Sequence, residues 1–349
     1  MLSLMRPVCI LTAAVCISPA YSQQKPGPDL PNVKVLEALP PHLNARVLRQ
    51  EQIVLPPGAG QELRAIYEQA KLWSPGSSLL VCFMGGRQEL RARIAVAAQE
   101  WTRWGNVQLN FGNVNNPVVC GPGAVYDIRI GFGYDGYWSL VGRDSINLAD
   151  QYEQSMNLEG YDIVPPSEPE FSQVVLHEFG HALGLHHEHQ NPLASCEEEF
   201  DWNTIYQYLA GHPNYWSKET VDFNLRRLVD DGRYTTVGEF DADSIMLYRF
   251  DAWMYKSKEQ SPCYIAKDNV ILSDGDQTSI RDAYPTVNVG AQLADRGSDI
   301  EKLRAELKAA PIDAQTLTQA LDQLNAIVSP DLSITSRRSI TDRLMAPRQ

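Results

Sequence analysis

Short stretches of apolar residues, some continuous and some alternating with polar ones, mark the middle of the chain as a β-sheet region. Residues 79–84 form a continuous apolar run of strand length that ends at Gly85. In residues 126–132 the apolar side chains fall on one face, and Asp127, Arg129 and Gly131 fall on the other. The pattern predicts strands over residues 79–84, 107–111, 126–132, 137–141 and 145–148.

Apolar residues at helical spacing predict two long helices that pack on this sheet. The first covers residues 88–104 and ends before Gly105. The second begins after Ser167, with Glu170 completing a capping box, and ends at Gly184. A last helix is predicted over residues 274–283. The fold class is therefore α+β: a mixed twisted sheet with two long helices, above a less regular lower subdomain formed by the aromatic-rich residues 190–240.

The two ends of the chain differ in pattern from this central part. Residues 1–22 have a basic start, an apolar stretch and a small-residue cleavage site, which predicts a signal peptide and export to a secreted or periplasmic location. Residues 23–75 are polar and rich in proline, and we interpret them as an N-terminal lead or pro-segment. Residues 76–287 form the predicted catalytic domain, and residues 288–349 a helical C-terminal extension.

Composition restricts the possible partners. The chain has 349 residues, 44% of them hydrophobic, and a formal net charge of -13. The acidic balance argues against nucleic acid and anionic membranes as partners. No stretch is long and apolar enough to suggest a membrane span. The oligomeric state stays open.

Four cysteines remain after the predicted signal peptide, and an even number in an exported chain suggests two disulfides. Three connectivities are possible, and free buried thiols are the alternative. We favour the pairs Cys82–Cys120 and Cys196–Cys263, each of which joins segments within one half of the domain. None of the four is spaced as a pair of zinc ligands.

The candidate chemistry lies in residues 177–189, which contain five of the seven histidines of the chain. Within them His177, Glu178, His181, Gly184 and His187 form the pattern H-E-x-x-H-x-x-G-x-x-H. Histidines four residues apart on a helix share one face, so His177 and His181 can bind one ion. Glycine at the helix end lets the chain turn and return His187 as a third ligand. Three protein ligands leave an open position, as in a catalytic zinc site.

Glu178 is the predicted catalytic base. It lies beside His177 and can take a proton from a zinc-bound water that attacks a peptide carbonyl. His186 and His189 flank the third ligand and could compete with it; by spacing we favour His187, and interpret the other two as surface or supporting residues. The prediction is a zinc metalloendopeptidase with one catalytic zinc ion and a protein or peptide substrate.

These residues resemble the zinc motif of the metzincin clan, in which a methionine turn lies below the metal. Met246, within residues 244–248, fits that turn. Glu188 directly follows the third histidine, and Tyr248 follows Met246 by two residues, as in the astacin family. The resemblance implies that Tyr248 can ligate zinc and then stabilise the transition state. It also implies that one strand of residues 127–142 is the edge to which a peptide substrate adds.

The chain departs from the astacin pattern in several places. Leu185, Asn191 and Leu247 stand where astacins usually have Phe, Arg and His. The aspartate-bearing motif with which astacins block their zinc is not recognisable in residues 23–75, and no cysteine there is placed as a removable ligand. The alternatives are a matrixin-like metzincin protease, a secreted zinc-containing binding or adhesion protein with little proteolytic activity, and a metal-dependent hydrolase acting on other substrates.

Overall fold

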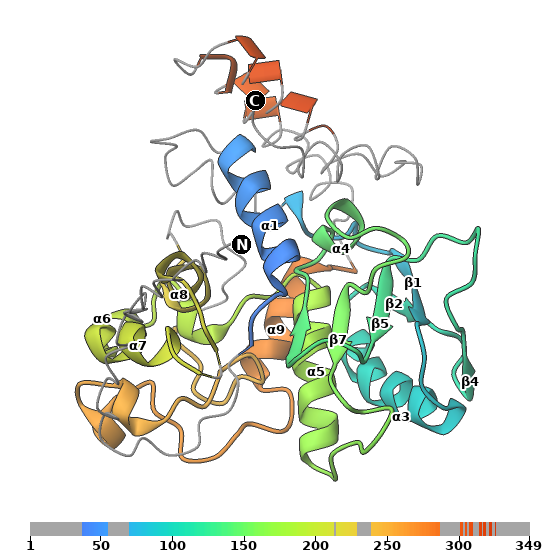
Figure 1. Cartoon of the computed structure of the whole chain (residues 1–349). Coiled ribbons are helices and arrows are strands. Elements are labelled where there is room, and N and C mark those ends of the chain that lie inside the picture. Colours follow the sequence, from blue (N-terminus) through green and yellow to red (C-terminus); the bar gives the residue numbers. More distant parts are fainter. Residues whose placement is uncertain are drawn as a thin grey trace, which may run out of the picture. The chain divides into compact units, whose positions relative to one another are not determined.

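The computed structural model describes residues 37–54, 70–212, 214–228 and 239–286, with isolated helical positions between 301 and 325 (Figure 1). The predicted signal peptide, most of the lead segment and most of the C-terminal extension lie outside the described residues. Among those described, no helix has the length and apolar character needed to cross a bilayer.

The predicted mixed sheet has five strands in the order β2-β1-β5-β7-β6. Four strands run parallel, and β6 runs antiparallel to β7 at one edge. A short hairpin of β3 (Gly112–Asn113) and β4 (Asn116–Pro117) lies beside the sheet. The sheet strands are β1 (Ser78–Phe83), β2 (Gln108–Asn110), β5 (Ile128–Gly131), β6 (Tyr137–Ser139) and β7 (Met156–Leu158).

The two long helices pack on one face of the sheet around the main hydrophobic core. Helix α3 (Gln88–Ala98) continues as the 3-10 helix η1 (Gln99–Arg103), and α5 (Glu170–Ala182) lies against both. Trp101 of η1 joins them, because its indole N–H donates to the carbonyl of Leu176 at 2.9 Å. This packing holds α5 rigidly beside the sheet.

The opposite face of the edge strand carries a second, smaller core. Neighbouring residues of a strand point to opposite faces, and Tyr137 packs in the main core while Trp138 packs with Leu43 and Val47. Those two residues belong to α1 (Pro41–Val54), the one element of the predicted lead segment that the structure describes. Helix α1 therefore covers this face of β6.

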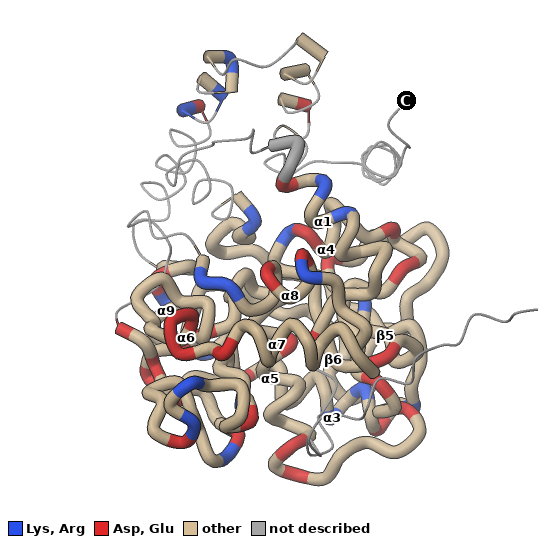
Figure 2. Tube along the Cα trace, turned by 60° about the vertical axis from the view of Figure 1, so that its left-hand side comes forward, with Lys and Arg blue, Asp and Glu red and all other residues tan. Residues whose placement is uncertain are grey.

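The lower part of the molecule is built from short helices around an aromatic core, as predicted. Figure 2 shows α6 as an acidic segment, and its Glu197 and Glu198 pair with Arg226 and Arg227. Its elements are η2 (Glu188–Gln190), α6 (Cys196–Glu199), α7 (Trp202–Leu209), α8 (Lys218–Leu225), η3 (Ala252–Met254) and η4 (Lys258–Gln260). The last helix, α9 (Asp274–Ala283), packs in the main hydrophobic core through Ile280 and Ala283.

Both preferred disulfides are present. Cys82–Cys120 fastens the segment after the β3–β4 hairpin to β1, and Cys196–Cys263 closes the lower part. Each bridge joins segments within one half of the molecule, as the sequence predicted. Disulfides of this kind are typical of proteins from oxidising compartments.

Three local predictions are wrong. Residues 145–148 are not a strand, because α4 (Asp144–Asn147) occupies this place. Strand β7 was missed, because all three of its residues are buried and no alternation marks it. Ser167 does not cap α5: the helix begins at Glu170 after Pro169, and the side chain of Glu168 accepts from the Ser172 N–H instead.

The predicted polar face of β5 is also buried. The guanidinium of Arg129 is fully enclosed and donates to the backbone carbonyls of Tyr126, Ser145 and Glu153. A buried charge is tolerated when hydrogen bonds satisfy it. Arg129 therefore ties α4 and the following loop to the sheet, next to the face that α1 covers.

Candidate metal centre

Helix α5 brings two of the predicted ligands together. His177 and His181 lie one turn apart, and their ring centroids are 4.9 Å from each other. The helix is apolar on nearly every side, and its residues from Val174 to Ala182 are all buried. A helix buried in this way has little freedom to move, so the two imidazoles are held in fixed positions.

The turn after α5 returns the third histidine to the first two. Gly184 has φ +97°, and a Cβ at this position would lie 2.4 Å from Leu72. Glycine is therefore required here both by the backbone conformation and by the close approach. The chain reverses, and Nε2 of His187 lies 3.1 Å from Nε2 of His181.

Backbone carbonyls fix the orientation of the two helix imidazoles. Nδ1 of His177 donates to the carbonyl of Ile245 at 2.8 Å, and Nδ1 of His181 donates to the carbonyl of Leu185 at 2.8 Å. With Nδ1 protonated, Nε2 carries the free lone pair that a metal ligand needs. Burial lowers the pKa of His187 to about 4, so its ring is neutral near pH 7.

Met246 lies directly below α5, where the predicted methionine turn should be. A Cβ on Gly180 would meet its sulfur at 2.3 Å, so the turn packs against the helix backbone. Asp276 of α9 fixes the turn from the other side, since it accepts from the Ser244 hydroxyl at 2.7 Å and the Ile245 N–H at 2.8 Å. The last helix thus supports the same turn whose carbonyl orients His177.

Glu178 is buried beside the histidines, with 2% of its surface exposed. Its Oε2 has no hydrogen-bond partner within the described part of the chain. Burial, reinforced by the negative charge of Glu37, raises the pKa of Glu178 well above its ordinary value. A buried carboxyl with an unpartnered oxygen and a raised pKa is the state expected of a group that exchanges protons with a ligand.

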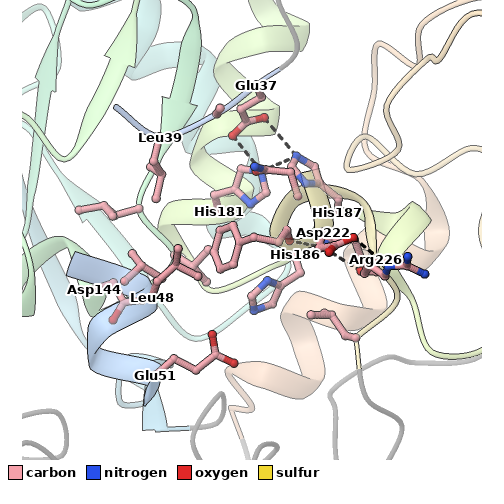
Figure 3. Close-up of a pocket in the computed structure, with 18 of the residues that line it drawn as sticks. Glu37, Leu39, Leu48, Glu51, Asp144, His181, His186, His187, Asp222 and Arg226 are labelled. Carbon is pink, nitrogen blue, oxygen red and sulfur yellow. Dashed lines mark hydrogen bonds and ion pairs between the residues drawn. The ribbon is translucent and has the colours of Figure 1, made fainter. Parts of the chain in front are cut away.

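The sequence analysis missed one member of the cluster, Glu37. It precedes α1 and is 8% exposed. Its Oε2 lies 3.2 Å from Nε2 of His177 and 3.1 Å from Nε2 of His187, and its Oε1 lies 3.4 Å from Nε2 of His181. Figure 3 shows Glu37 beside His181 and His187. The only signal in the sequence is a single acidic residue inside the run Val35-Leu36-Glu37-Ala38-Leu39.

Tyr248 also contacts Glu37. Its hydroxyl donates to Oε2 at 2.7 Å and accepts from the backbone N–H of the same residue at 3.1 Å. The ring packs against His177 and His187, with centroid distances of 5.3 and 4.7 Å. Burial, and then the charges of Glu37 and Glu178, raise the pKa of Tyr248 well above its ordinary value, so the phenol stays protonated.

The remaining two histidines of the motif region lie outside this group. His189 is buried and stacks on His187, and its Nε2 lies 3.0 Å from the carbonyl of Asn224. His186 is half-buried and lines a cavity of about 450 Å³ beside the cluster (Figure 3). The spacing argument that favoured His187 agrees with this placement.

The donor set suits a divalent metal ion. Glu37, His177, His181 and His187 each offer one ligand atom, and the four atoms lie within 4.8 Å of one another. Two unlike donor types, imidazole and carboxylate, converge on one buried point, which is the ligand chemistry that zinc accepts. Negative charge is kept on Glu37 because His181 and His187 outweigh its burial and hold its pKa well below its ordinary value.

Comparison with known proteins gives structural relatives. No protein-family model matches the chain, and no curated protein sequence matches it. The structure of myroilysin is similar, with 33% sequence identity and a TM-score of 0.52, over 62% of this chain and 96% of that chain. A crystal structure of myroilysin gives 32% identity and a TM-score of 0.45, over 62% and 86%.

A more distant match is high choriolytic enzyme 1, a hatching enzyme zinc-protease from the medaka fish Oryzias latipes. It has 17% identity and a TM-score of 0.34, over 61% of this chain and 94% of that chain. A likeness at this level carries no argument about the site. The myroilysin match, which covers almost all of that chain at 33% identity, is the informative one.

Proposed function

The chain belongs to the same family as myroilysin and has the metzincin-like α+β fold that its sequence predicts, and on this premise we propose that it is an exported zinc endopeptidase. One observation carries the proposal. Three histidine Nε2 atoms converge, and a buried glutamate with an unpartnered oxygen follows the first of them on the same helix. A metal-storage or structural site does not need that glutamate.

His177, His181 and His187 would hold one zinc ion, which would act as a Lewis acid and lower the pKa of water to about 7. Glu178 then acts as the general base: it takes a proton from the attacking water and passes it to the leaving peptide nitrogen. Its raised pKa suits a group that must accept and release a proton near neutral pH. Because α5 is buried in the core, it keeps the Glu178 carboxyl beside the reacting atoms.

Tyr248 is proposed to stabilise the oxyanion that develops on the substrate carbonyl. Its phenol is buried and protonated, so it can donate a hydrogen bond. In the described structure this hydroxyl is bonded to Glu37. Tyr248 can therefore serve the substrate only when Glu37 does not hold it.

The substrate is proposed to bind as an extra strand. Strand β6 is the edge of the sheet, and Ser139 and Leu140 at its end line the same cavity as His181 and His187. A sheet edge offers unpaired N–H and C=O groups that an extended peptide can use. A peptide bound there would cross the cluster of histidines.

The test compares the chain with its Glu178→Gln variant on casein and on a set of fluorogenic peptides. Removal of a general base lowers turnover by about 100- to 10,000-fold. Glu170→Gln, at the exposed start of the same helix, is the matched control and should cleave at the normal rate. Zinc content, measured by atomic emission, should be equal in all three proteins.

A zinc-loaded chain that cleaves no peptide in any form would contradict the peptidase proposal. It would favour a secreted metal-binding protein in its place. Equal cleavage by the chain and by Glu178→Gln would remove Glu178 from the mechanism without removing the peptidase activity.

A further inference from the structure

We propose that the short helix η2 couples the third proposed metal ligand, His187, to the α8 wall of the adjoining cavity, with His189 and Gln190 as positioning residues; this inference rests on the proposed peptidase function. Helix η2 follows His187 directly in the chain. Its first residue, Glu188, donates its backbone N–H to the carbonyl of Met246 at 2.9 Å. One side of η2 is therefore fixed to the methionine turn below the histidines.

The other side of η2 closes the end of α8. The last carbonyls of a helix have no partner within the helix, and in α8 they include those of Phe223 and Asn224. The Gln190 amide donates to the carbonyl of Phe223 at 3.0 Å and to that of Arg226 at 3.1 Å. Nε2 of His189 donates to the carbonyl of Asn224 at 3.0 Å. Two side chains of η2 thus cap the C-terminus of α8.

Two further contacts make this connection rigid. The Leu228 N–H donates to the carbonyl of Gln190 at 2.8 Å, so the two backbones are joined as well. The His189 ring stacks on that of His187, with centroids 5.1 Å apart, and meets the Phe250 ring edge-on at 4.9 Å. Only 1% of His189 and 5% of Gln190 is exposed, so neither side chain has room to move away.

Helix α8 is also one wall of the cavity of about 450 Å³. Phe223 and Asn224, whose carbonyls accept from η2, line this cavity together with His181 and His187. Figure 3 shows Arg226, at the end of α8, beside the same cavity. A substrate side chain in the cavity would therefore contact the helix whose end is bonded to the residues next to the third histidine.

The far side of α8 is held independently of η2. The Arg226 guanidinium donates to Glu197 at 2.6 Å and lies 4.0 Å above the ring of Trp202. The Tyr206 hydroxyl donates to Asp222. These contacts fix α8 to α6 and α7, so loss of the η2 bonds should uncouple α8 from His187 without unfolding it.

The coupling must act in both directions. Loss of a residue that positions a metal ligand lowers metal affinity by about 10- to 100-fold. If release of α8 from η2 weakens zinc binding by this factor, then bound zinc must suppress the release by the same factor. Zinc and a peptide that packs on α8 would thus favour the same arrangement of η2.

The first experiment measures this effect of zinc on α8. Amide hydrogen exchange of residues 218–228 is followed by mass spectrometry, with and without zinc, in the full chain carrying Glu178→Gln to prevent self-cleavage. Zinc should slow this exchange by about 10- to 100-fold. Gln190→Met, which keeps the length of the side chain but has no amide, should lose most of the effect. Gln260→Met, at an exposed site on η4, is the matched control and should keep it.

The second experiment measures the effect on the metal. Gln190→Met and His189→Phe should each lower zinc affinity by about 10- to 100-fold and change the visible absorption spectrum of bound Co²⁺, which depends on ligand geometry. His189→Phe keeps a ring beside His187 but has no donor. His189→Gln restores a donor and should recover most of the affinity. Circular dichroism of the metal-free proteins shows whether each variant is folded.

Exchange of α8 that is insensitive to zinc in the parent would overturn the proposal, and this measurement needs no variant to fold. Zinc affinities and Co²⁺ spectra equal to those of the parent in both Gln190→Met and His189→Phe would overturn it as well. The outcome is separable from that of the proposed function, because neither measurement uses turnover. If zinc protects α8 but the chain with Glu178 cleaves no peptide, the coupling stands and the peptidase proposal fails. If the chain cleaves peptides and α8 ignores zinc, the peptidase stands and the coupling does not.

Discussion

Helix α5 and the segment before α1 both bring ligand atoms to one point, but they are held there very differently. His177 and His181 sit on a helix enclosed by the main core, and backbone carbonyls orient both rings. Glu37 lies on a short segment just before α1, and α1 is held by a small apolar cluster and a few polar hydrogen bonds. By this contrast the three histidines are the candidates for ligands that stay in place, and Glu37 is the candidate that is held least firmly.

The first prediction is that His181→Ala greatly lowers the affinity for the metal ion. Because a lost supporting contact already lowers metal affinity by about 10- to 100-fold, loss of a ligand held by the core should lower it by more than about 1,000-fold. Competition with a chelating dye measures the affinity. His212→Ala, on the exposed surface, is the control. Nearly unchanged affinity would mean that His181 is not a ligand.

The second prediction concerns Tyr248→Phe, measured in a Glu37→Gln background in which the carboxylate that holds the Tyr248 hydroxyl is replaced. Loss of one oxyanion donor should lower kcat by about 100- to 1,000-fold, with little change in zinc content. Tyr152→Phe, at an exposed site, should keep the parent rate. If kcat is unchanged, Tyr248 serves only as the partner of Glu37.

The third prediction weakens the anchor while leaving the ligand intact. Leu43→Ala removes a fully buried side chain of α1 and should weaken its docking by about 2 to 5 kcal/mol. Because Leu39 and Leu48 of the same segment line the cavity beside His181 and His187, this variant should admit a peptide hydroxamate faster than the parent. Val96→Ala, at an exposed site on α3, should have no effect. Unchanged access after Leu43→Ala would show that Glu37 holds the segment without help from α1.

The fourth prediction, with the smallest effect, concerns how the free energy of unfolding depends on pH through Glu188, which lies below the cluster. Burial raises the pKa of Glu188 to about 7, although Asp241 N–H and the Asn191 amide donate to it. Because the folded pKa lies above the unfolded value of about 4.3, the fold favours the protonated form. The stability that Glu188 contributes is fully present below about pH 4.3 and is lost as the pH rises through about 7.

Glu188→Gln has no charge to bury, so its free energy of unfolding should exceed that of the parent by about 1 to 3 kcal/mol at pH 8, and by less at pH 5. Urea unfolding of the metal-free proteins at the two pH values measures this difference. Parallel pH dependence in the two proteins would contradict it. The result would separate a charge effect near His187 from the ligand effects above.

The sequence predicted best what is local along the chain. The histidine motif spans eleven residues, and one helix with a glycine turn is enough to bring its side chains together. The helix and strand periods also placed α3, β1, β5 and α9 close to their observed bounds. The roles of Glu178 and Tyr248 stay predictions until they are measured.

What the sequence could not predict depends on long-range contacts. Glu37 lies 140 residues before His177, and nothing near it in the chain marks a carboxylate as a ligand. Strand β7 is buried on both faces and therefore shows no alternation. The polar face of β5 was misinterpreted because Arg129 is satisfied by carbonyls from segments that fold around it.

Trp138 gives the molecule an internal optical reporter. Its indole is fully enclosed, and two of the side chains that enclose it, Leu43 and Val47, belong to α1. Departure of α1 would bring water to this ring, and indole emission shifts to longer wavelength when the ring becomes hydrated. A Trp138→Phe variant subtracts the signal of the other tryptophans. The emission spectrum would therefore show whether α1 stays docked, without substrate, label or added ligand.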